Sequence, residues 1–307
     1  MKDFSSIDVV ADALTARRYI PDRALATTVY LAVRLGKPIF LEGEPGVGKT
    51  ELAKVLAEIL ETELIRLQCY EGLDTQTALY EWNYPRQMLE VRLQEARGVD
   101  KDQIGSDIFT TDFLLERPLL KAIRFEGPQP PVLLIDEVDR SDEEFEAFLL
   151  EVLSDFQISI PEIGTITAQQ IPIVVLTSNR TRELHDALKR RCLYHWIDYP
   201  DVTKEIDIVS ARVPNIEANL ATQLAFFMKR IRGEDLYKRP GIAETIDWAE
   251  ALLALGASEL DPDTIEATLG CILKYKGDID KLERTGVDKL LAAARQAREI
   301  AESPMTR

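Results

Sequence analysis

Residues 37–51 read Lys-Pro-Ile-Phe-Leu-Glu-Gly-Glu-Pro-Gly-Val-Gly-Lys-Thr-Glu, and this stretch decides the fold. Its first part, residues 38–41, is an apolar run that predicts a short buried strand. Residues 43–50 match the pattern G-x-x-x-x-G-K-[ST] at every fixed position, and apolar residues at helical spacing follow from Leu52 onward. Strand, glycine-rich loop and helix in this order indicate a phosphate-binding loop rather than a chance glycine-rich turn.

Phosphate chemistry accounts for each residue type in this motif. The glycines let the backbone turn tightly and aim its N–H groups at phosphate oxygens, and the helix start adds the positive end of its dipole. We expect Lys49 to reach the β- and γ-phosphates of ATP and Thr50 to offer its hydroxyl to Mg²⁺. The predicted nucleotide-binding residues of the loop are Gly43, Glu44, Pro45, Gly46, Val47, Gly48, Lys49, Thr50 and Glu51.

A second motif follows the apolar strand at residues 132–135, which ends in Asp136-Glu137. A buried strand of a parallel sheet places a carboxylate at its carboxyl edge. We therefore predict that Asp136 binds Mg²⁺ together with Thr50, and that Glu137 activates the attacking water as general base. A strand that merely ends in an acidic turn would look the same in isolation, and the upstream phosphate-binding loop favours the Mg²⁺ site. Asn179, at the end of another apolar strand, is a candidate to orient that water.

The order of strand and helix patterns predicts an α/β fold. Up to about residue 200, short apolar strands alternate with helices, which indicates a parallel sheet sandwiched by helices. After Pro200-Asp201 only helical patterns occur. We predict a nucleotide-binding domain over residues 1–200, with a helix-bearing insertion at about 82–112, and a small all-α lid domain over residues 201–307. Strand patterns lie at residues 38–41, 64–69, 132–135, 173–176 and 193–197, and lid helices at 206–213, 220–231, 242–255, 265–273 and 279–300.

Shorter elements are predicted from turn residues. Two helices separated by Pro21-Asp22 precede the first strand, and Gly36 is expected to end the second of them. Three further expectations are a break at residues 82–85, a helix over residues 113–124 and a hairpin over residues 157–170.

Composition narrows the classes of function. The 307-residue chain has a formal net charge of −16, which argues against nucleic acid as a partner because such binding requires a positive footprint. No apolar run has the roughly 18 residues of a membrane span, and residues 1–6 lack the pattern of a signal peptide. We therefore expect a cytoplasmic protein without a membrane span. Its three cysteines and two histidines match neither a disulfide framework nor a zinc pattern.

The order of these motifs, followed by the basic pair Arg190-Arg191 and a helical lid, resembles the AAA+ ATPases. Residues 134–140, Leu-Ile-Asp-Glu-Val-Asp-Arg, are similar to the Walker B segment of the MoxR branch, whose usual form ends in Glu-Ile-Asn-Arg. That branch also carries an insertion where residues 82–112 lie. Residues 66–74 and 80–83 are similar to the CoxD-like subfamily, whose members help to mature the active site of a molybdenum-containing carbon monoxide dehydrogenase. The resemblance covers residues 20 to 255.

The resemblance implies a role for each matching residue. Lys49 and Thr50 correspond to the Walker A residues, Asp136 and Glu137 to the Walker B pair, and Asn179 to sensor 1. Arg190 and Arg191 lie where the family has an arginine finger, which acts on the nucleotide of a neighbouring subunit. Arg191 is the better candidate; the alternative for the pair is a basic helix end that the dipole favours.

One stretch departs from the family pattern. The family has a Ser-Pro-Arg step at the start of a lid helix, where the arginine serves as sensor 2. This chain reads Lys238-Arg239-Pro240-Gly241 there. The nucleotide-binding role of sensor 2 belongs to Arg239, to Lys238 or to neither residue. The departure therefore concerns how the lid is coupled to the nucleotide, and it does not concern hydrolysis itself.

The resemblance further implies an ATP-hydrolysing chaperone. It would act as a homo-oligomeric ring, a hexamer, on a client metalloenzyme, with a von Willebrand A-type protein as a possible adaptor. Two alternatives stay open at this point. One is a nucleic-acid motor or loader, because other AAA+ proteins act on DNA; the other is a nucleotide-dependent switch with little turnover.

Overall fold

The computed structural model describes residues 4–98 and 108–303. The chain forms two compact units, and each of them draws on separate stretches of sequence. Unit 1 holds the residues up to Ala13, Asp22–Glu42 and Thr50–Trp196, whereas unit 2 holds Leu14–Pro21, Gly43–Lys49 and the residues from Ile197 onward. The division into domains over 1–200 and 201–307 therefore stays a prediction.

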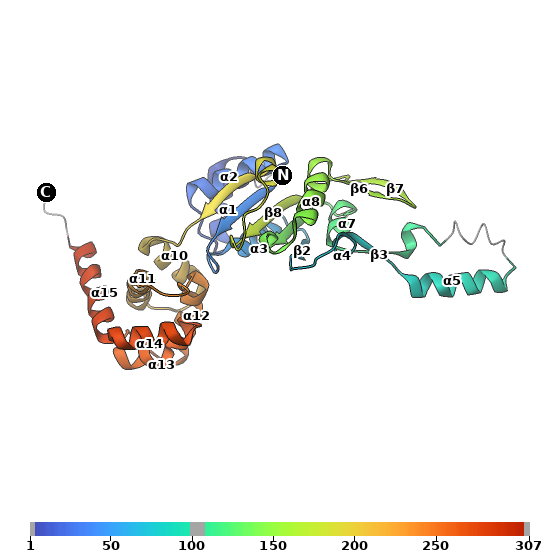
Figure 1. Cartoon of the computed structure of the whole chain (residues 1–307). Helices are drawn as coiled ribbons and strands as arrows, with labels where there is room; N and C mark the ends of the chain where they lie inside the picture. The colour runs from blue at the N-terminus through green and yellow to red at the C-terminus, as the bar shows by residue number, and fades with distance from the viewer. Residues whose placement is uncertain (1–3, 99–107, 304–307) are drawn as a thin grey trace. The chain divides into compact units, whose positions relative to one another are not determined.

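Unit 1 is built on a parallel five-stranded sheet with the strand order β2-β5-β8-β1-β9; β2 and β8 of this sheet are labelled in Figure 1. Every residue of β1, β5 and β8 is buried, as expected for central strands of a parallel sheet that is covered on both faces. The predicted parallel sheet is confirmed, and all five predicted strands are present. The strands are β1 (Ile39–Gly43), β2 (Leu64–Gln68), β5 (Val132–Asp136), β8 (Ile173–Ser178) and β9 (Leu193–Ile197).

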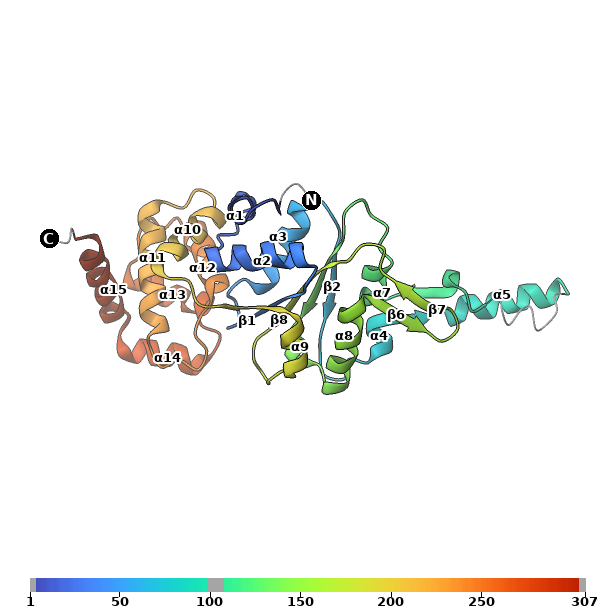
Figure 2. The same ribbon diagram turned by 90° about the horizontal axis from the view of Figure 1, so that it is seen from above.

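Helices cover both faces of this sheet, with α2 and α3 on one side and α7, α8 and α9 on the other (Figure 2). On the second side, Phe145 of α8 and Leu188 of α9 share a buried core with the strand residues Leu133 and Leu176. Outside the insertion, the helices that have most of their residues in this unit are α1 (Ile7–Ala16), α2 (Arg23–Leu35), α3 (Lys49–Ile59), α7 (Pro118–Ile123), α8 (Glu143–Asp155) and α9 (Asp186–Arg191). As predicted, Gly36 ends α2 with a φ of +62°, and its N–H donates to the Ala32 carbonyl.

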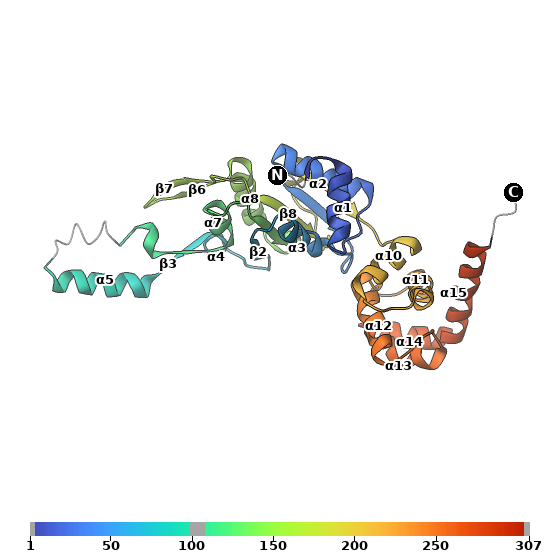
Figure 3. The same ribbon diagram turned by 180° about the vertical axis from the view of Figure 1, so that it is seen from behind.

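The insertion between β2 and α7 carries a helix, as predicted. After α4 (Thr75–Leu79), β3 (Tyr80–Trp82) pairs antiparallel with β4 (Leu114–Glu116), and α5 (Tyr84–Ala96) and the 3₁₀ helix η2 (Thr111–Phe113) lie between them. Figures 1 and 3 show α5 beyond this strand pair and away from the five-stranded sheet. Residues 99–107 of the predicted insertion lie outside the described residues.

The expected break at residues 82–85 is confirmed, because β3 ends at Trp82 and α5 begins at Tyr84. The Asn83 side chain accepts from the Arg86 N–H and caps α5, and Pro85 lies in the first turn, where no N–H is needed. Another expectation here is wrong. The expected helix over 113–124 begins only at Pro118, since Leu114–Glu116 is paired with β3. The predicted hairpin over 157–170 is confirmed as β6 (Gln157–Ile160) paired with β7 (Gly164–Thr167).

Unit 2 contains six helices from Val202 to Glu302, packed around buried Phe227 and Trp248. One prediction here is wrong: residues 279–300 are two helices rather than one, because Gly286 has a φ of +90° and separates them. None of the helices in the described part of the chain is long and apolar enough to cross a membrane. The helices are α10 (Val202–Arg212), α11 (Ala218–Arg232), α12 (Ile242–Ala254), α13 (Pro262–Ile272), α14 (Lys276–Thr285) and α15 (Val287–Glu302).

Candidate functional site

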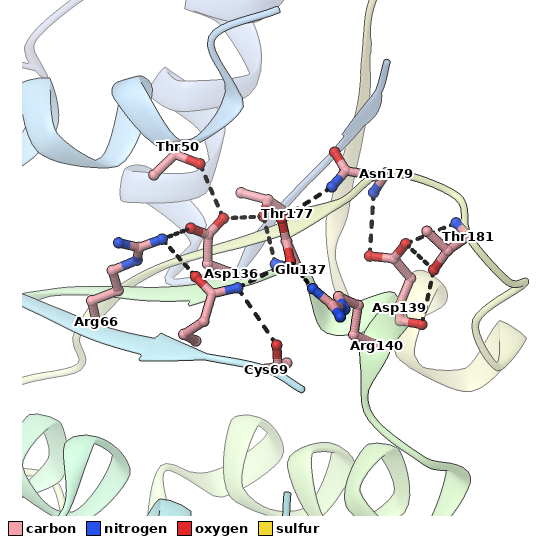
Figure 4. A network of polar contacts seen from close by, with 11 residues as sticks. Thr50, Arg66, Cys69, Asp136, Glu137, Asp139, Arg140, Thr177, Asn179 and Thr181 are labelled. Atoms are coloured by element: carbon pink, nitrogen blue, oxygen red, sulfur yellow. Dashed lines mark hydrogen bonds and ion pairs between the residues drawn. The ribbon is translucent and has the colours of Figure 1, made fainter. Parts of the chain in front are cut away.

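Asp136 lies at the carboxyl end of β5 and is 3% exposed. Its Oδ1 atom accepts hydrogen bonds from Thr50 Oγ1 at 3.0 Å and from Thr177 Oγ1 at 2.5 Å (Figure 4). The first helical turn after the phosphate-binding loop therefore meets the end of the buried strand, as the two motifs predict. One carboxylate beside one hydroxyl fits Mg²⁺, which proteins usually hold with one or two such ligands plus substrate phosphates.

Glu137 follows in a left-handed conformation with a φ of +54°. Such backbone costs about 1–3 kcal/mol for a residue other than glycine and often occurs at functional sites. The Glu137 N–H donates to Thr177 Oγ1 at 2.9 Å. Its carboxylate accepts from Asn179 Nδ2 at 3.4 Å, from Gln68 Nε2 at 3.2 Å and from Arg140 at 3.3 Å. The predicted base and the predicted water-orienting residue are thus brought together.

Asp139 fixes the loop that carries Asn179. It is 2% exposed, and its Oδ1 atom accepts from the Asn179 N–H at 3.2 Å. Its Oδ2 atom accepts from the Thr181 N–H at 2.8 Å and from the Thr181 hydroxyl at 2.7 Å. Because Asp139 lies three residues after Asp136, this network ties the end of β8 to the end of β5 (Figure 4).

The phosphate-binding loop itself, Gly43–Lys49, belongs to unit 2. Lys49 is 6% exposed, and its Nζ atom donates to the carbonyls of Gly43 at 2.7 Å and Glu44 at 2.8 Å. Gly46 and Gly48 have φ angles of +78° and +94°, which only glycine adopts without strain. The loop thus has the tight, glycine-dependent turn that its sequence predicts.

The start of α12 lies directly against this loop within unit 2. The Ala243 N–H donates to the Gly46 carbonyl at 3.1 Å. A Cβ atom added at Gly241 would lie 2.8 Å from the Pro45 carbonyl oxygen and 2.9 Å from Gly46, so this approach requires a glycine. The Arg239 side chain, the candidate for sensor 2, is exposed two residues earlier.

A buried ion pair holds this segment, and sequence reasoning missed it. The Arg232 guanidinium donates to both carboxylate oxygens of Glu205, at 2.6 and 2.8 Å, and its Nε atom donates to the Pro240 carbonyl at 2.8 Å. Thr245 Oγ1 donates to the same carboxylate at 2.7 Å. Arg232 is 8% exposed and Glu205 is fully buried. A charged residue on a helix usually faces water, so the pattern alone gave no signal for this pair.

Arg66 and Gln68 of β2 are also functional candidates that the motifs did not reveal. Gln68 lies opposite Asp136 in the parallel register, and Arg66 Nη2 lies 2.6 Å from Asp136 Oδ2. Side chains alternate between the two faces along a strand, so Arg66 and Gln68 lie on the same face of β2. This alternation is the only signal by which the sequence could have revealed them.

The predicted arginine fingers lie elsewhere. Arg190 and Arg191 are exposed at the end of α9, and Arg191 donates to the Leu150 carbonyl at 2.7 Å. Within the described residues, no hydrogen bond or ion pair joins either arginine to Asp136, Glu137 or Asn179. Their role on a neighbouring subunit stays a prediction.

Cys69 lies beside the carboxylates but is not an ionised thiol. Burial first, and then the negative charges of Asp136, Asp139 and Glu137, raise its pKa to about 12. Burial and these charges therefore favour the protonated thiol, the less nucleophilic form, at neutral pH.

Comparison with known proteins identifies the family. The model of the AAA domain (dynein-related subfamily) matches residues 38–192, just over half of the chain, so the chain belongs to this family. The AAA domain binds ATP with Mg²⁺ and hydrolyses it, so these residues form an ATPase domain, and AAA+ proteins typically assemble into rings.

Individual relatives are more distant. An uncharacterized Staphylococcus aureus protein is 29% identical over 175 residues, which cover 54% of this chain and 57% of that protein. A Lon protease of Desulforamulus reducens is 27% identical over 167 residues, which cover 51% of this chain and 17% of the protease. The chain thus aligns with little more than half of the first relative and a small part of the second. The RuvB Holliday junction branch migration motor of Thermotoga maritima aligns over 81% of this chain and 67% of its own, with 21% identity and a TM-score of 0.43.

Proposed function

We propose that the protein is an ATP-hydrolysing, MoxR-type chaperone that remodels or matures a client protein. The proposal of ATP hydrolysis rests on one hydrogen-bond network, in which Thr50 donates to Asp136 and Asn179 donates to Glu137. A scaffold or switch with little turnover has no need for a carboxylate held beside a polar amide at this position. The formal net charge of −16 gives no support to the nucleic-acid motor.

In this proposal each side chain has one task. Lys49 and the loop N–H groups hold the phosphates, and Thr50 and Asp136 hold Mg²⁺, which when bound neutralises charge on the β- and γ-phosphates. Glu137 takes a proton from the attacking water, and Asn179 orients that water. Asp139 keeps Asn179 in place through the backbone N–H.

Assembly into a hexameric ring is part of the same proposal. Arg190 and Arg191 are exposed on α9, where a neighbouring subunit is able to present its nucleotide to them. An arginine supplied by another subunit stabilises charge in phosphoryl transfer. The ATP site of one subunit would then be complete only in the assembly.

The client side of the proposal rests on the insertion and on the MoxR resemblance. The helix α5 exposes Met88, Leu89 and Leu93 at 57%, 60% and 42%, and exposed apolar side chains of this kind often mark sites of protein interaction. The resemblance makes a metalloenzyme the proposed client and a von Willebrand A-type protein the proposed adaptor, in the cytoplasm.

The experiment that tests the client is capture with Glu137→Gln, which should hold ATP and the client together. Proteins that co-purify with this variant in ATP are identified by mass spectrometry and compared with those on the Lys49→Ala variant, which should not hold nucleotide. A metalloenzyme or its adaptor enriched only with Glu137→Gln supports the proposal. Equal recovery with both variants, or enrichment of nucleic acid, contradicts it.

A further inference from the structure

A positive charge already lies on the carboxylate that is predicted to receive Mg²⁺. Arg66 Nη2 lies 2.6 Å from Asp136 Oδ2, and the exposed fractions of the two side chains are 51% and 4%. The same Nη2 atom donates to Gln68 Oε1 at 2.5 Å. Figure 4 shows the guanidinium approaching Asp136 from β2, beside the Thr50 hydroxyl.

The local charge explains why this ion pair forms. Asp136 is buried, and Glu137 and Asp139 follow within three residues. A buried carboxylate without a countercharge is costly. Hydroxyls of Thr50 and Thr177 satisfy Oδ1, whereas Arg66 supplies the positive charge on Oδ2. The structure thus balances the charge of Asp136 with the chain's own residues.

Binding of Mg²⁺ changes this balance. A cation held by Thr50 and Asp136 adds two positive charges close to the guanidinium, and like charges at such short range repel strongly where water is largely excluded. Half of the Arg66 side chain is already exposed, so the guanidinium is able to move into water once the cation takes its place beside Asp136. Asp136, in contrast, is fixed by β5.

We propose that Arg66 is a built-in counter-ion that competes with Mg²⁺ for Asp136, so that Arg66 sets the Mg²⁺ concentration at which the site loads. This inference rests on the proposed nucleotide site, because it assumes that Mg²⁺ binds at Thr50 and Asp136. Its consequence is that loss of the guanidinium charge tightens Mg²⁺ binding but weakens the protein in the absence of Mg²⁺.

The test measures Mg²⁺ binding directly. Mg²⁺ is titrated calorimetrically into the full chain saturated with ADP, for the unsubstituted protein and for Arg66→Gln, Arg66→Lys and Arg124→Gln. Arg124 is a matched control, because it forms a 2.6 Å ion pair with a different carboxylate, Glu116, in the same unit. Arg66→Gln should lower the dissociation constant for Mg²⁺ roughly tenfold, since it removes one charge near the metal. Arg66→Lys keeps the charge and should stay near the original value, and Arg124→Gln should not change it.

A second readout is thermal unfolding. In EDTA, Arg66→Gln should melt below the unsubstituted protein, and excess Mg²⁺ with ADP should close the gap. Unchanged or weaker Mg²⁺ binding by Arg66→Gln would overturn the counter-ion assignment alone. Thr50→Ala separates a failure of the counter-ion assignment from a failure of the proposed metal site. If Thr50→Ala leaves Mg²⁺ binding intact, then the proposed metal site itself is wrong. If Arg66→Gln does not fold, Arg66→Ala and Arg66→Met carry the same expectation in the same titration.

Discussion

At the scale of single residues, the function depends on Glu137. Three side chains, those of Gln68, Arg140 and Asn179, donate hydrogen bonds to its carboxylate. Glu137→Gln keeps the shape and still accepts from Asn179, but it no longer takes a proton from water. We expect turnover to fall about 100- to 10,000-fold while the affinity for ATP changes little. Steady-state kinetics and equilibrium binding of ATP measure the two effects. Hydrolysis at the original rate by this variant would show that another group activates the water.

The three cysteines offer a second test at this scale. Burial raises the pKa of both Cys69 and Cys192 to about 12, so at pH 8 only about one thiol in 10,000 is ionised at each position. Cys271 is partly exposed. We expect a disulfide reagent to modify one thiol per native chain at pH 8 and all three after unfolding. In Cys271→Ser the rapid reaction should disappear; if it persists, the environment of Cys69 or Cys192 is more open than described.

The sequence predicted some site residues and missed others for a physical reason. Asp136 and Asn179 come at the ends of apolar runs, and parallel strands bring such ends to one edge. Thr50 is the last residue of the phosphate-binding motif that follows a third such run. The alternation of β2 places Arg66 and Gln68 on one face but does not show what that face contacts, and Arg232 has no such signal. A charged residue in a short amphipathic element looks the same whether it faces water or a buried partner. Only the three-dimensional fold shows that a carboxylate lies opposite each arginine.

At the scale of elements, the segment before α12 is held against the phosphate-binding loop by the Arg232–Glu205 pair. Removal of one partner leaves an unpaired buried charge, which costs about 3–5 kcal/mol. Arg232→Met should therefore lower the free energy of unfolding by that amount and weaken ADP binding, as the Pro240 and Gly241 backbone is released. Urea denaturation and ADP titration measure both effects.

The double variant Arg232→Met with Glu205→Leu is the control for this prediction. It removes both charges, so it should be more stable than Arg232→Met alone while ADP binding stays weak. A double variant that is no more stable than the single one would mean that the cost lies in packing rather than in the unpaired Glu205 carboxylate.

Element length explains which parts of the fold could be predicted. The five strands of the sheet are apolar runs long enough to show a pattern, whereas β3 and β4 are each three residues long and leave no periodicity to detect. Gly286 likewise interrupts an apolar pattern that continues on both sides, and an isolated glycine is tolerated in many helices. In the structure Gly286 ends α14, and its N–H donates to the Leu282 and Glu283 carbonyls.

At the scale of the whole molecule, one chain supplies only part of the proposed ATP site. Thr50, Asp136, Glu137 and Asn179 come together within one chain, whereas Arg190 and Arg191 lie apart from them on the exposed end of α9. If Arg191 serves the nucleotide of a neighbour, two defective subunits should complement each other. Arg191→Ala keeps its own ATP site but lacks the finger, and Glu137→Gln has the finger but cannot hydrolyse. In a mixed ring, the intact ATP site of an Arg191→Ala subunit can lie beside the Arg191 of a Glu137→Gln subunit, and one complete ATP site then forms.

We therefore expect each variant alone to be nearly inactive and their mixture, co-assembled with ATP, to regain part of the activity. ATPase assays over a range of mixing ratios measure this, with light scattering to confirm that both variants assemble. Arg190→Ala in place of Arg191→Ala distinguishes the two arginines, because only the variant that lacks the acting residue has activity to regain. If no ratio restores activity although mixed rings form, then the arginine acts within its own chain or takes no part, and the ATP site would be complete without a neighbour.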